Sequence, residues 1–384
     1  MNIVKYPGGK ERELEIISKF MPSIVKNYYE PFVGGGTVYL TMTANHYYVN
    51  DISSDLMNLY KCVAKQDAEF FASMEEINRL WKSVDAYCEE NNTLVNLFIK
   101  YRNHEITDTK LESKIDLYIK NNNKILLSFV EPMNCGNTDV FLDFFKKDIF
   151  KKFNRIKELH YNEQKITDED IKDNITGIFK ASFYMYIRSL YDHMGHYTEG
   201  FKAMLYLFIR DFCYSSMFRF NTDGGFNVPY GGISYNRKNY DKIFEKYKNQ
   251  ELVRQMENTT ICCEDYRTFL EKYPPRSNDF MFIDPPCDTF LSTYNQKTFG
   301  TDEQKILADY LLNKCPCNFM ADIKYTDFIG SLYPANYVCA NGQPLRIVFF
   351  DKNNSASLTN QNKKQIKHIL IMNYDDIVGT NLFE

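Results

Sequence analysis

Long hydrophobic runs are missing from this chain of 384 residues. No segment approaches the roughly 18 consecutive apolar residues that a membrane-spanning helix needs. The first ten residues, MNIVKYPGGK, lack the charged stretch followed by an apolar stretch that marks a secretory signal. Hydrophobic residues still make up 44% of the chain and aromatic residues 16%, which is typical of a globular protein. We therefore expect a cytoplasmic protein without membrane contact.

The ten cysteines lack the spacing of a disulfide framework, so we expect reduced and mostly buried thiols. Cys262-Cys263 and Cys315-Pro316-Cys317 come nearest to a metal pattern. No second Cys-x-x-Cys and no pair of histidines accompanies them, so we expect no metal site.

An excess of positive charge is also absent, because the formal net charge is −4. This balance neither points to nucleic acid nor excludes it, since a basic patch on one face is enough to attract phosphates. No internal repeat or low-complexity tract interrupts the chain. The length suits one large domain or two of ordinary size.

The glycine content and the spacing of apolar residues change along the chain. Residues 1–65 carry apolar runs punctuated by glycine, which predicts the alternating strands and helices of an α/β core. From about 66 to 210 the apolar residues recur at helical spacing, and α/β alternation resumes later. We therefore predict a core formed by 1–65 and 255–384, split by a largely helical insertion, 66–254.

A turn of three glycines lies in YYEPFVGGGTVYL, residues 28–40, which predicts a strand, a tight turn and a helix. Glycines let a ligand approach the backbone, and a helix N-terminus attracts polar groups, although a tight turn without a ligand is the alternative. The next apolar run ends at Asn50-Asp51, where a carboxylate can accept hydrogen bonds from ribose hydroxyls. Neither G-x-G-x-x-G nor a Walker lysine is present, so a nucleoside without pyrophosphate fits better than NAD or ATP.

A second polar site follows the apolar run Phe280–Ile283, which predicts a buried strand. Parallel strands present functional residues at their carboxyl ends, where Asp284 stands before Pro285 and Pro286. The prolines lack N–H donors, so the carboxylate and nearby backbone carbonyls form an accepting site suited to an amino group. The alternative is a plain Asp-Pro-Pro turn that ends the strand.

In this order, the motifs resemble those of the Dam-like S-adenosylmethionine-dependent DNA adenine-N6 methyltransferases. The matching stretches are KYPGGK, EPFVGGG, the acidic strand end Asp51, RDFCYSSMFRFNTDGGFNVPYGGISYN, DPPC and the closing QIKHILIMNY. The resemblance covers the two ends of the chain and residues 206–240. It implies an α/β fold, namely a Rossmann-like methyltransferase core with an inserted, largely helical DNA-recognition domain that carries a β-hairpin.

The resemblance also implies roles in binding S-adenosylmethionine. Tyr6 would stack on the cofactor's adenine, Lys10 would contact the cofactor, and Asp51 would bind its ribose. The residues lining its methionine side would be Phe32, Gly34, Gly35 and Gly36. Asp265 would accept from the cofactor's adenine amino group, the alternative being a solvent-exposed loop aspartate. Asp284 would lie where the cofactor meets the target base.

The resemblance implies that Asp284, Pro285, Pro286 and Cys287 form the catalytic motif. The Asp284 carboxylate and the Pro285 carbonyl would accept both hydrogens of the adenine amino group and restore its lone pair for direct attack on the methyl group. The base would have to be flipped out of the duplex first. Cys287 stands where family members have an aromatic that stacks on this base, and Phe290 and Tyr294 are candidate substitutes.

Residues 222–225 carry a hairpin signal, and the resemblance implies that this segment of the insertion reads DNA. Between residues 210 and 254, basic residues exceed acidic ones by three. The predicted DNA-contacting residues are Lys5, Arg219, Asn221, Asn227, Tyr230, Asn236, Arg237 and Lys238. Tyr230 is the candidate for intercalation, and a plain basic surface hairpin is the alternative.

The resemblance implies double-stranded DNA as the partner and a monomer or weak dimer, and it allows a companion restriction endonuclease. Three alternatives stay open. One is a homologue that binds DNA and cofactor but transfers no methyl group because of Cys287. A second is a methyltransferase acting on protein amides, which the basic hairpin disfavours. The third is a nucleotide-binding interaction module.

Overall fold

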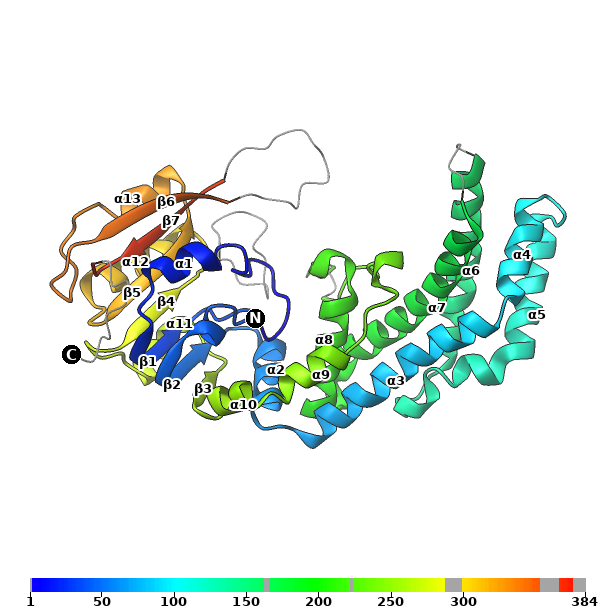
Figure 1. Cartoon of the computed structure of the whole chain (residues 1–384), viewed down its shortest axis with the longest axis horizontal. Coiled ribbons are helices and arrows are strands. Elements are labelled where there is room, and N and C mark those ends of the chain that lie inside the picture. Colours follow the sequence, from blue (N-terminus) through cyan, green and yellow to red (C-terminus); the bar gives the residue numbers. More distant parts are fainter. Residues whose placement is uncertain are drawn as a thin grey trace. The chain divides into compact units, whose positions relative to one another are not determined.

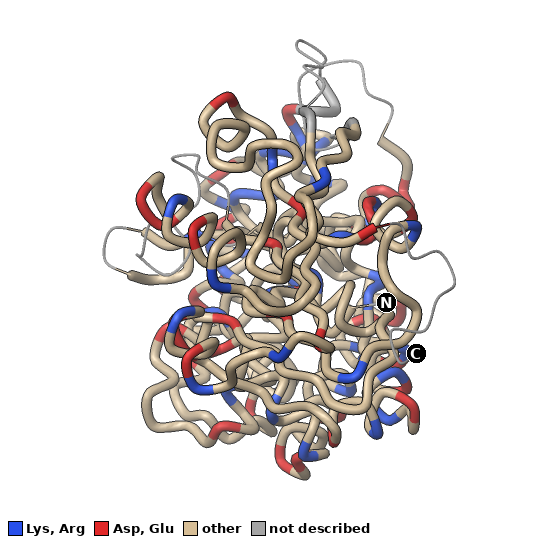
Figure 2. The backbone as a smooth tube through the Cα atoms, turned by 90° about the vertical axis from the view of Figure 1, so that its left-hand side faces the viewer, with Lys and Arg blue, Asp and Glu red and all other residues tan. Residues whose placement is uncertain are grey.

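The computed structural model describes residues 2–161, 166–217, 219–221, 224–286, 299–352 and 366–375. The chain divides into two compact units. The first consists of Met1–Ala64 and Gln250–Glu384, and the second of Lys65–Asn249. Within the described residues, no helix is both long and apolar enough to cross a lipid bilayer. Basic and acidic residues are interspersed along the backbone rather than segregated by sign (Figure 2).

The first unit is built on a sheet that has seven strands in the described part of the chain, in the order β3-β2-β1-β4-β5-β7-β6 (Figure 1). Strands β1 to β5 run parallel, whereas β7 is antiparallel to both neighbours. The strands are β1 (Ile24–Glu30), β2 (Thr43–Asn50), β3 (Thr259–Cys262), β4 (Phe280–Ile283), β5 (Asn318–Lys324), β6 (Arg346–Lys352) and β7 (Ile366–Met372). This mixed, mostly parallel sheet confirms the predicted α/β core.

Helices flank and connect these strands. In the first unit they are α1 (Leu14–Phe20), η1 (Tyr39–Thr41), α2 (Ser54–Ala64), α10 (Gln250–Glu257), α11 (Tyr266–Lys272), α12 (Thr301–Asn313) and α13 (Asp327–Leu332). The strand predicted before Asp284 is confirmed as β4, and its four side chains are fully buried. A parallel strand covered on both faces has to be apolar at every position, which is why this run does not alternate.

The helix predicted directly after the glycine turn is wrong. Only the short 3₁₀ helix η1 follows, and β2 begins at Thr43. The intervening residues are TVYLTM, in which Thr37, Val38 and Thr41 are β-branched and lose side-chain freedom in a helix. The glycine turn therefore leads into η1 and β2 rather than into the N-terminus of an α-helix.

The second unit is helical. Its elements are α3 (Ala68–Glu90), α4 (Thr93–Arg102), α5 (Asp108–Leu127), η2 (Glu131–Met133), α6 (Asp139–Tyr161), α7 (Asp168–Tyr191), η3 (Met194–His196), α8 (Glu199–Phe212), η4 (Tyr214–Ser216), η5 (Ile233–Tyr235) and α9 (Asp241–Tyr247). Its aromatic core includes Trp81, whose ring contacts Phe183, Phe208 and Phe212. Lys180 is fully buried beside Trp81 and donates to Asp85 and to the carbonyl of Asn236.

A narrow antiparallel pairing follows α8. Phe220 bridges Phe226, the N–H of Asn221 donates to the carbonyl of Gly225, and the N–H of Asn227 donates to that of Arg219. These contacts join the two apolar flanks of the predicted turn through an isolated bridge rather than through named strands. Residues 222 and 223 at its tip lie outside the described residues.

Candidate active site

The N-terminal segment lies along the glycine turn. The N–H of Ile3 donates to the carbonyl of Gly35 at 2.7 Å. A Cβ at Gly35 would lie 2.6 Å from the carbonyl oxygen of Val4, and one at Gly34 would lie 3.1 Å from the ring of Tyr6. A side chain at Gly35 would collide with this backbone, so glycine lets the N-terminal segment and Tyr6 lie against the turn.

Asp51 follows β2 and faces the same turn. Its Oδ2 accepts from the N–H of Gly34 at 3.2 Å, and its Oδ1 accepts from the N–H of Ser53 at 2.9 Å. The carbonyl of Gly34 accepts from the hydroxyl of Tyr60 at 2.9 Å. Burial raises the pKa of Asp51 to about 6 against the opposing effect of its backbone donors. Asp51 is therefore an oriented acceptor that is ionised at neutral pH.

The neighbouring Asn50 holds three strand ends together. Its side-chain amide donates to the carbonyls of Pro31 at 3.1 Å and Glu264 at 3.0 Å. Its side-chain oxygen accepts from the N–H of Glu264 at 2.9 Å. Because Asn50 is buried and fully engaged, it fixes the loops after β1 and β3 beside Asp51.

Asp284 is placed at the carboxyl end of β4 as predicted, and Lys10 is its ion-pair partner. The Nζ of Lys10 lies 2.9 Å from the Oδ1 of Asp284 and 2.9 Å from the Oδ2 of Asp322 on β5. The other oxygen of Asp322 lies 3.0 Å from the Nδ1 of His368 on β7. Four residues from distant parts of the chain, Lys10, Asp284, Asp322 and His368, are thus joined by direct polar contacts, and we call them the Lys10 network.

Burial opposes the charges in this network, and pairing outweighs it. Burial alone would lower the pKa of Lys10, but the charges of Asp284 and Asp322 raise it above its ordinary value. Burial alone would raise the pKa of Asp322, but Lys10 and His368 hold it below its ordinary value. Close beside them, burial raises the pKa of Glu30, which accepts from the hydroxyl of Tyr28 at 2.6 Å.

The Asp-Pro-Pro backbone is held by a helix that follows it in sequence. The side-chain amide of the buried Gln304, in α12, donates to the carbonyl of Pro286 at 3.1 Å. The carbonyl of Pro286 is therefore engaged within the protein. Cys287, Phe290 and Tyr294 lie outside the described residues.

An aromatic group adjoins the glycine turn. Phe32, predicted to line the cofactor site, contacts Tyr266 and Phe299 at ring-centroid distances of 5.2 and 5.6 Å. Asp265 begins α11, accepts from the N–H of Arg267 at 3.0 Å and pairs with its guanidinium. The side chain of Asp265 is one-third exposed, and its predicted role toward an adenine amino group stays a prediction.

The predicted DNA-contacting residues of the second unit fall into two groups. Exposed side chains are Arg219, Asn221, Asn227 and Arg237. The other three are less exposed, and they bond within the unit as Arg219 also does, through its donation to the carbonyl of Asn227. Asn236 is buried, accepts from Tyr230 and donates to the carbonyl of Asp173. Lys238 donates to the carbonyl of Asp211 and lies over the ring of Tyr235.

Tyr230, the predicted intercalating residue, is half-buried, with its ring near Trp81 and Tyr184. In the first unit, Lys5 is exposed.

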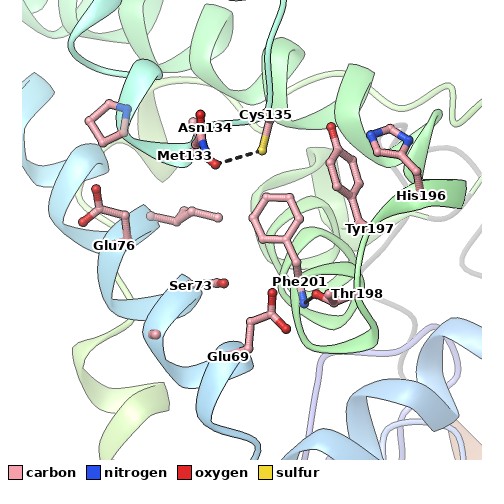
Figure 3. Close-up of a pocket in the computed structure, with 13 residues that line it drawn as sticks. Glu69, Ser73, Glu76, Met133, Asn134, Cys135, His196, Tyr197, Thr198 and Phe201 are labelled. Carbon is pink, nitrogen blue, oxygen red and sulfur yellow. Dashed lines mark hydrogen bonds between the residues drawn. The ribbon is translucent and has the colours of Figure 1, made fainter.

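A pocket of about 360 Å³ lies within the second unit. It is formed by α3, the segment around η2 and the start of α8, with Glu69, Glu76, Tyr197 and Phe201 among its lining (Figure 3). None of the residues predicted for cofactor, catalysis or DNA lines it. No group of three or more His, Cys, Asp or Glu in the described residues is arranged to hold a metal ion.

Sequence reasoning missed Asp322, His368 and Gln304. For Asp322 a signal was present, because a charged residue in the middle of the apolar run FMADI is seldom buried without a partner. His368 directly precedes the apolar run ILIM, which is a weaker signal. No local pattern identifies Gln304, which lies on an ordinary amphipathic helix.

The family model and the similar proteins found by comparison indicate the same class of enzyme. The family model of the D12 class N6 adenine-specific DNA methyltransferases matches residues 6–337. The Type II methyltransferase M.MjaIII of Methanocaldococcus jannaschii is 24% identical over 347 residues, which is 86% of each chain. The DNA adenine methylase of Vibrio cholerae is 23% identical over 312 residues, 80% of this chain and 74% of that one. The Type II methyltransferase M.CviBI of Paramecium bursaria Chlorella virus NC1A is 34% identical over 134 residues, 34% of this chain and 47% of that protein.

Proposed function

Because this chain belongs to the D12 class N6 adenine-specific DNA methyltransferases, we propose that it transfers a methyl group from S-adenosylmethionine to the N6 amino group of adenine in double-stranded DNA, at a short specific sequence. One observation carries this proposal. Asp51, Glu30 and Asp284 follow or end β2, β1 and β4, which are adjacent parallel strands. Their carboxyl ends meet along one edge of the sheet, where open α/β sheets bind their ligands.

The residues beside the glycine turn fit a nucleoside cofactor. Asp51 is an ionised acceptor whose two oxygens are oriented by backbone N–H groups, as binding of ribose hydroxyls requires. Tyr6 offers an aromatic face beside Gly34, and Phe32 adjoins them. S-adenosylmethionine, when bound, supplies an electrophilic methyl group on a sulfonium. We assign Tyr6, Phe32, the three glycines and Asp51 to its binding, and Lys10 and Asp265 to its periphery.

Asp284 is the acceptor for the target amino group in this proposal. An ionised carboxylate has about four lone-pair sites, so the ion pair with Lys10 uses only part of its capacity. Together with the Pro285 carbonyl, it accepts the two hydrogens of the adenine amino group and draws the nitrogen lone pair out of the ring. Positioning and electrostatics of this kind need no covalent intermediate.

The second unit supplies sequence recognition. Arg219, Asn221, Asn227 and Arg237 are exposed on or near the hairpin and offer donors to base edges and phosphates. Tyr230, Asn236 and Lys238 position this segment from within, so we expect them to affect DNA binding through its shape. The target adenine is flipped out of the duplex, at a cost of about a few kcal/mol.

Cys287 supports one alternative, a homologue that binds DNA and cofactor but transfers the methyl group poorly. A cysteine offers no flat surface for the flipped base, and stacking of a base on an aromatic is worth about 1–3 kcal/mol. Cys287→Tyr is then expected to raise activity several-fold. The type II methyltransferases among the relatives make a companion restriction endonuclease worth testing, with cleavage of unmodified host DNA as the readout.

The deciding experiment uses labelled S-adenosylmethionine and adenine-containing duplexes, followed by digestion to nucleosides. N6-methyladenine is the expected product, and Asp284→Ala is expected to reduce its formation more than about 100-fold with cofactor binding retained. Cofactor binding without any methyladenine would support the impaired homologue. Absence of both would support an interaction module, and residual activity of Asp284→Ala above about one-hundredth would remove Asp284 from its role.

A further inference from the structure

Two members of the Lys10 network, Asp322 and His368, connect to Asp284 through Lys10 and have no part in the mechanism given above. Asp322 stands in the interior of β5, the strand next to β4, and its side chain is fully buried. His368 stands on β7 and is 6% exposed. A buried carboxylate and imidazole in a sheet are costly unless they are paired, and each is paired here with the other.

The register of the sheet explains how they meet. Asp322 pairs with Leu370 and Lys324 pairs with His368 across β5 and β7. His368 is therefore the diagonal neighbour of Asp322, two positions along on the same face of the sheet. From that face Asp322 reaches Lys10 at 2.9 Å, the same distance as that from Lys10 to Asp284. One ammonium group is thus shared equally by a buried carboxylate and the proposed catalytic one.

We propose that Asp322 and His368 are positioning residues that set how strongly Lys10 neutralises Asp284, and so how well Asp284 accepts from the adenine amino group. This inference rests on the proposed function of the site. A carboxylate that held the whole charge of Lys10 would be a weaker acceptor toward a neutral amino group. Asp322 draws part of that charge away, and His368 fixes the orientation of Asp322 through Nδ1.

The test is single-turnover methyl transfer at saturating S-adenosylmethionine, with the dissociation constants of cofactor and duplex measured separately. Asp322→Asn keeps the side-chain shape but removes one carboxylate, so only Asp284 remains of the two carboxylates paired with Lys10. We expect its transfer rate to fall at least tenfold while both dissociation constants stay within threefold of wild type. Asp309→Asn is the matched control, because Asp309 is also paired with a lysine but lies on the surface of α12. We expect this control to transfer at a rate within twofold of wild type.

A second variant separates tuning from mere structural support. In Lys10→Met/Asp322→Asn the excess positive charge beside Asp284 is gone, so the double variant is expected to transfer faster than Asp322→Asn alone. A purely structural role would make the double variant equal or slower. His368→Asn keeps a nitrogen donor near the Nδ1 position, and it is expected to retain more activity than His368→Leu.

The outcomes are distinct from those for the proposed function. If wild type makes no N6-methyladenine, the proposed function itself fails. If wild type is active and Asp322→Asn matches it, the inference fails and the function stands. Slower transfer that is accompanied by equally weakened cofactor binding would also overturn the inference, as would a double variant no faster than Asp322→Asn.

Discussion

Replacing Lys10 with methionine is expected to destabilise the first unit, which contains the sheet, by an amount that depends on pH. Lys10 is the shared cation of Asp284, whose side chain is 26% exposed, and of Asp322, whose side chain is fully buried. Water can solvate Asp284 after the change, but it cannot reach Asp322. Removing one partner of a buried ion pair typically costs about 3–5 kcal/mol. Because Asp322 keeps its contact with His368, we expect the lower end, about 3 kcal/mol.

The sign of the pH dependence follows from Asp322. In the wild type its pKa is held below the ordinary value, so its pairing stabilises the fold above the ordinary carboxylate range and is lost only at lower pH. Without Lys10, burial raises the pKa of Asp322, and the carboxylate takes up a proton on acidification. The destabilisation should therefore be larger at pH 8 than at pH 5.

The assay has to observe the sheet itself. The single tryptophan, Trp81, lies in α3 of the helical unit, so its fluorescence does not report the sheet. Amide hydrogen exchange of β5 and β7 peptides does, and a loss of about 3 kcal/mol accelerates exchange of the most protected amides by about 100-fold. Peptides of α3 serve as the internal control and should be unchanged.

The double variant Lys10→Met/Asp322→Asn completes a double-mutant cycle for this ion pair. It removes both buried charges and is expected to recover most of the lost protection. Acceleration below about fivefold in Lys10→Met, an effect independent of pH, or a double variant that exchanges faster than Lys10→Met would refute this account of the network.

Three further predictions concern other parts of the molecule. Cofactor affinity should fall about tenfold between pH 7 and pH 5, because Asp51 takes up a proton near its pKa of about 6 and becomes a weaker acceptor; an Asp51→Asn variant that titrates equally would contradict this. Gly35→Ala places a methyl group 2.6 Å from a backbone carbonyl and should weaken cofactor binding at least tenfold in titration calorimetry. Gly195→Ala, where nothing lies within 4 Å, is its control. Lys180→Met should destabilise the helical unit by about 1–3 kcal/mol in urea unfolding followed by Trp81 fluorescence, and no change would show that this buried lysine is dispensable.

Local patterns in the chain were enough for the family, the α/β core and the position of Asp284. The run Phe280–Ile283 is apolar at every position because a central parallel strand is covered on both faces. The prolines after it end that strand, so the carboxylate had to stand at a strand tip. The same kind of reasoning was wrong for the residues after the glycine turn, where β-branched side chains and the nearby start of β2 leave room only for η1.

What the tertiary structure decided is which charges meet. Lys10, Asp284, Asp322 and His368 are spread over most of the chain, and no spacing in the sequence relates them. They come together because β4, β5 and β7 are neighbours in the sheet and the N-terminal segment returns along the glycine turn. Likewise, only the packing of the second unit shows that Asn236, one of the predicted DNA-contacting residues, is buried. Pairing of distant strands depends on the free energy of the whole fold, whereas a strand, a turn or a motif is written into a few adjacent residues.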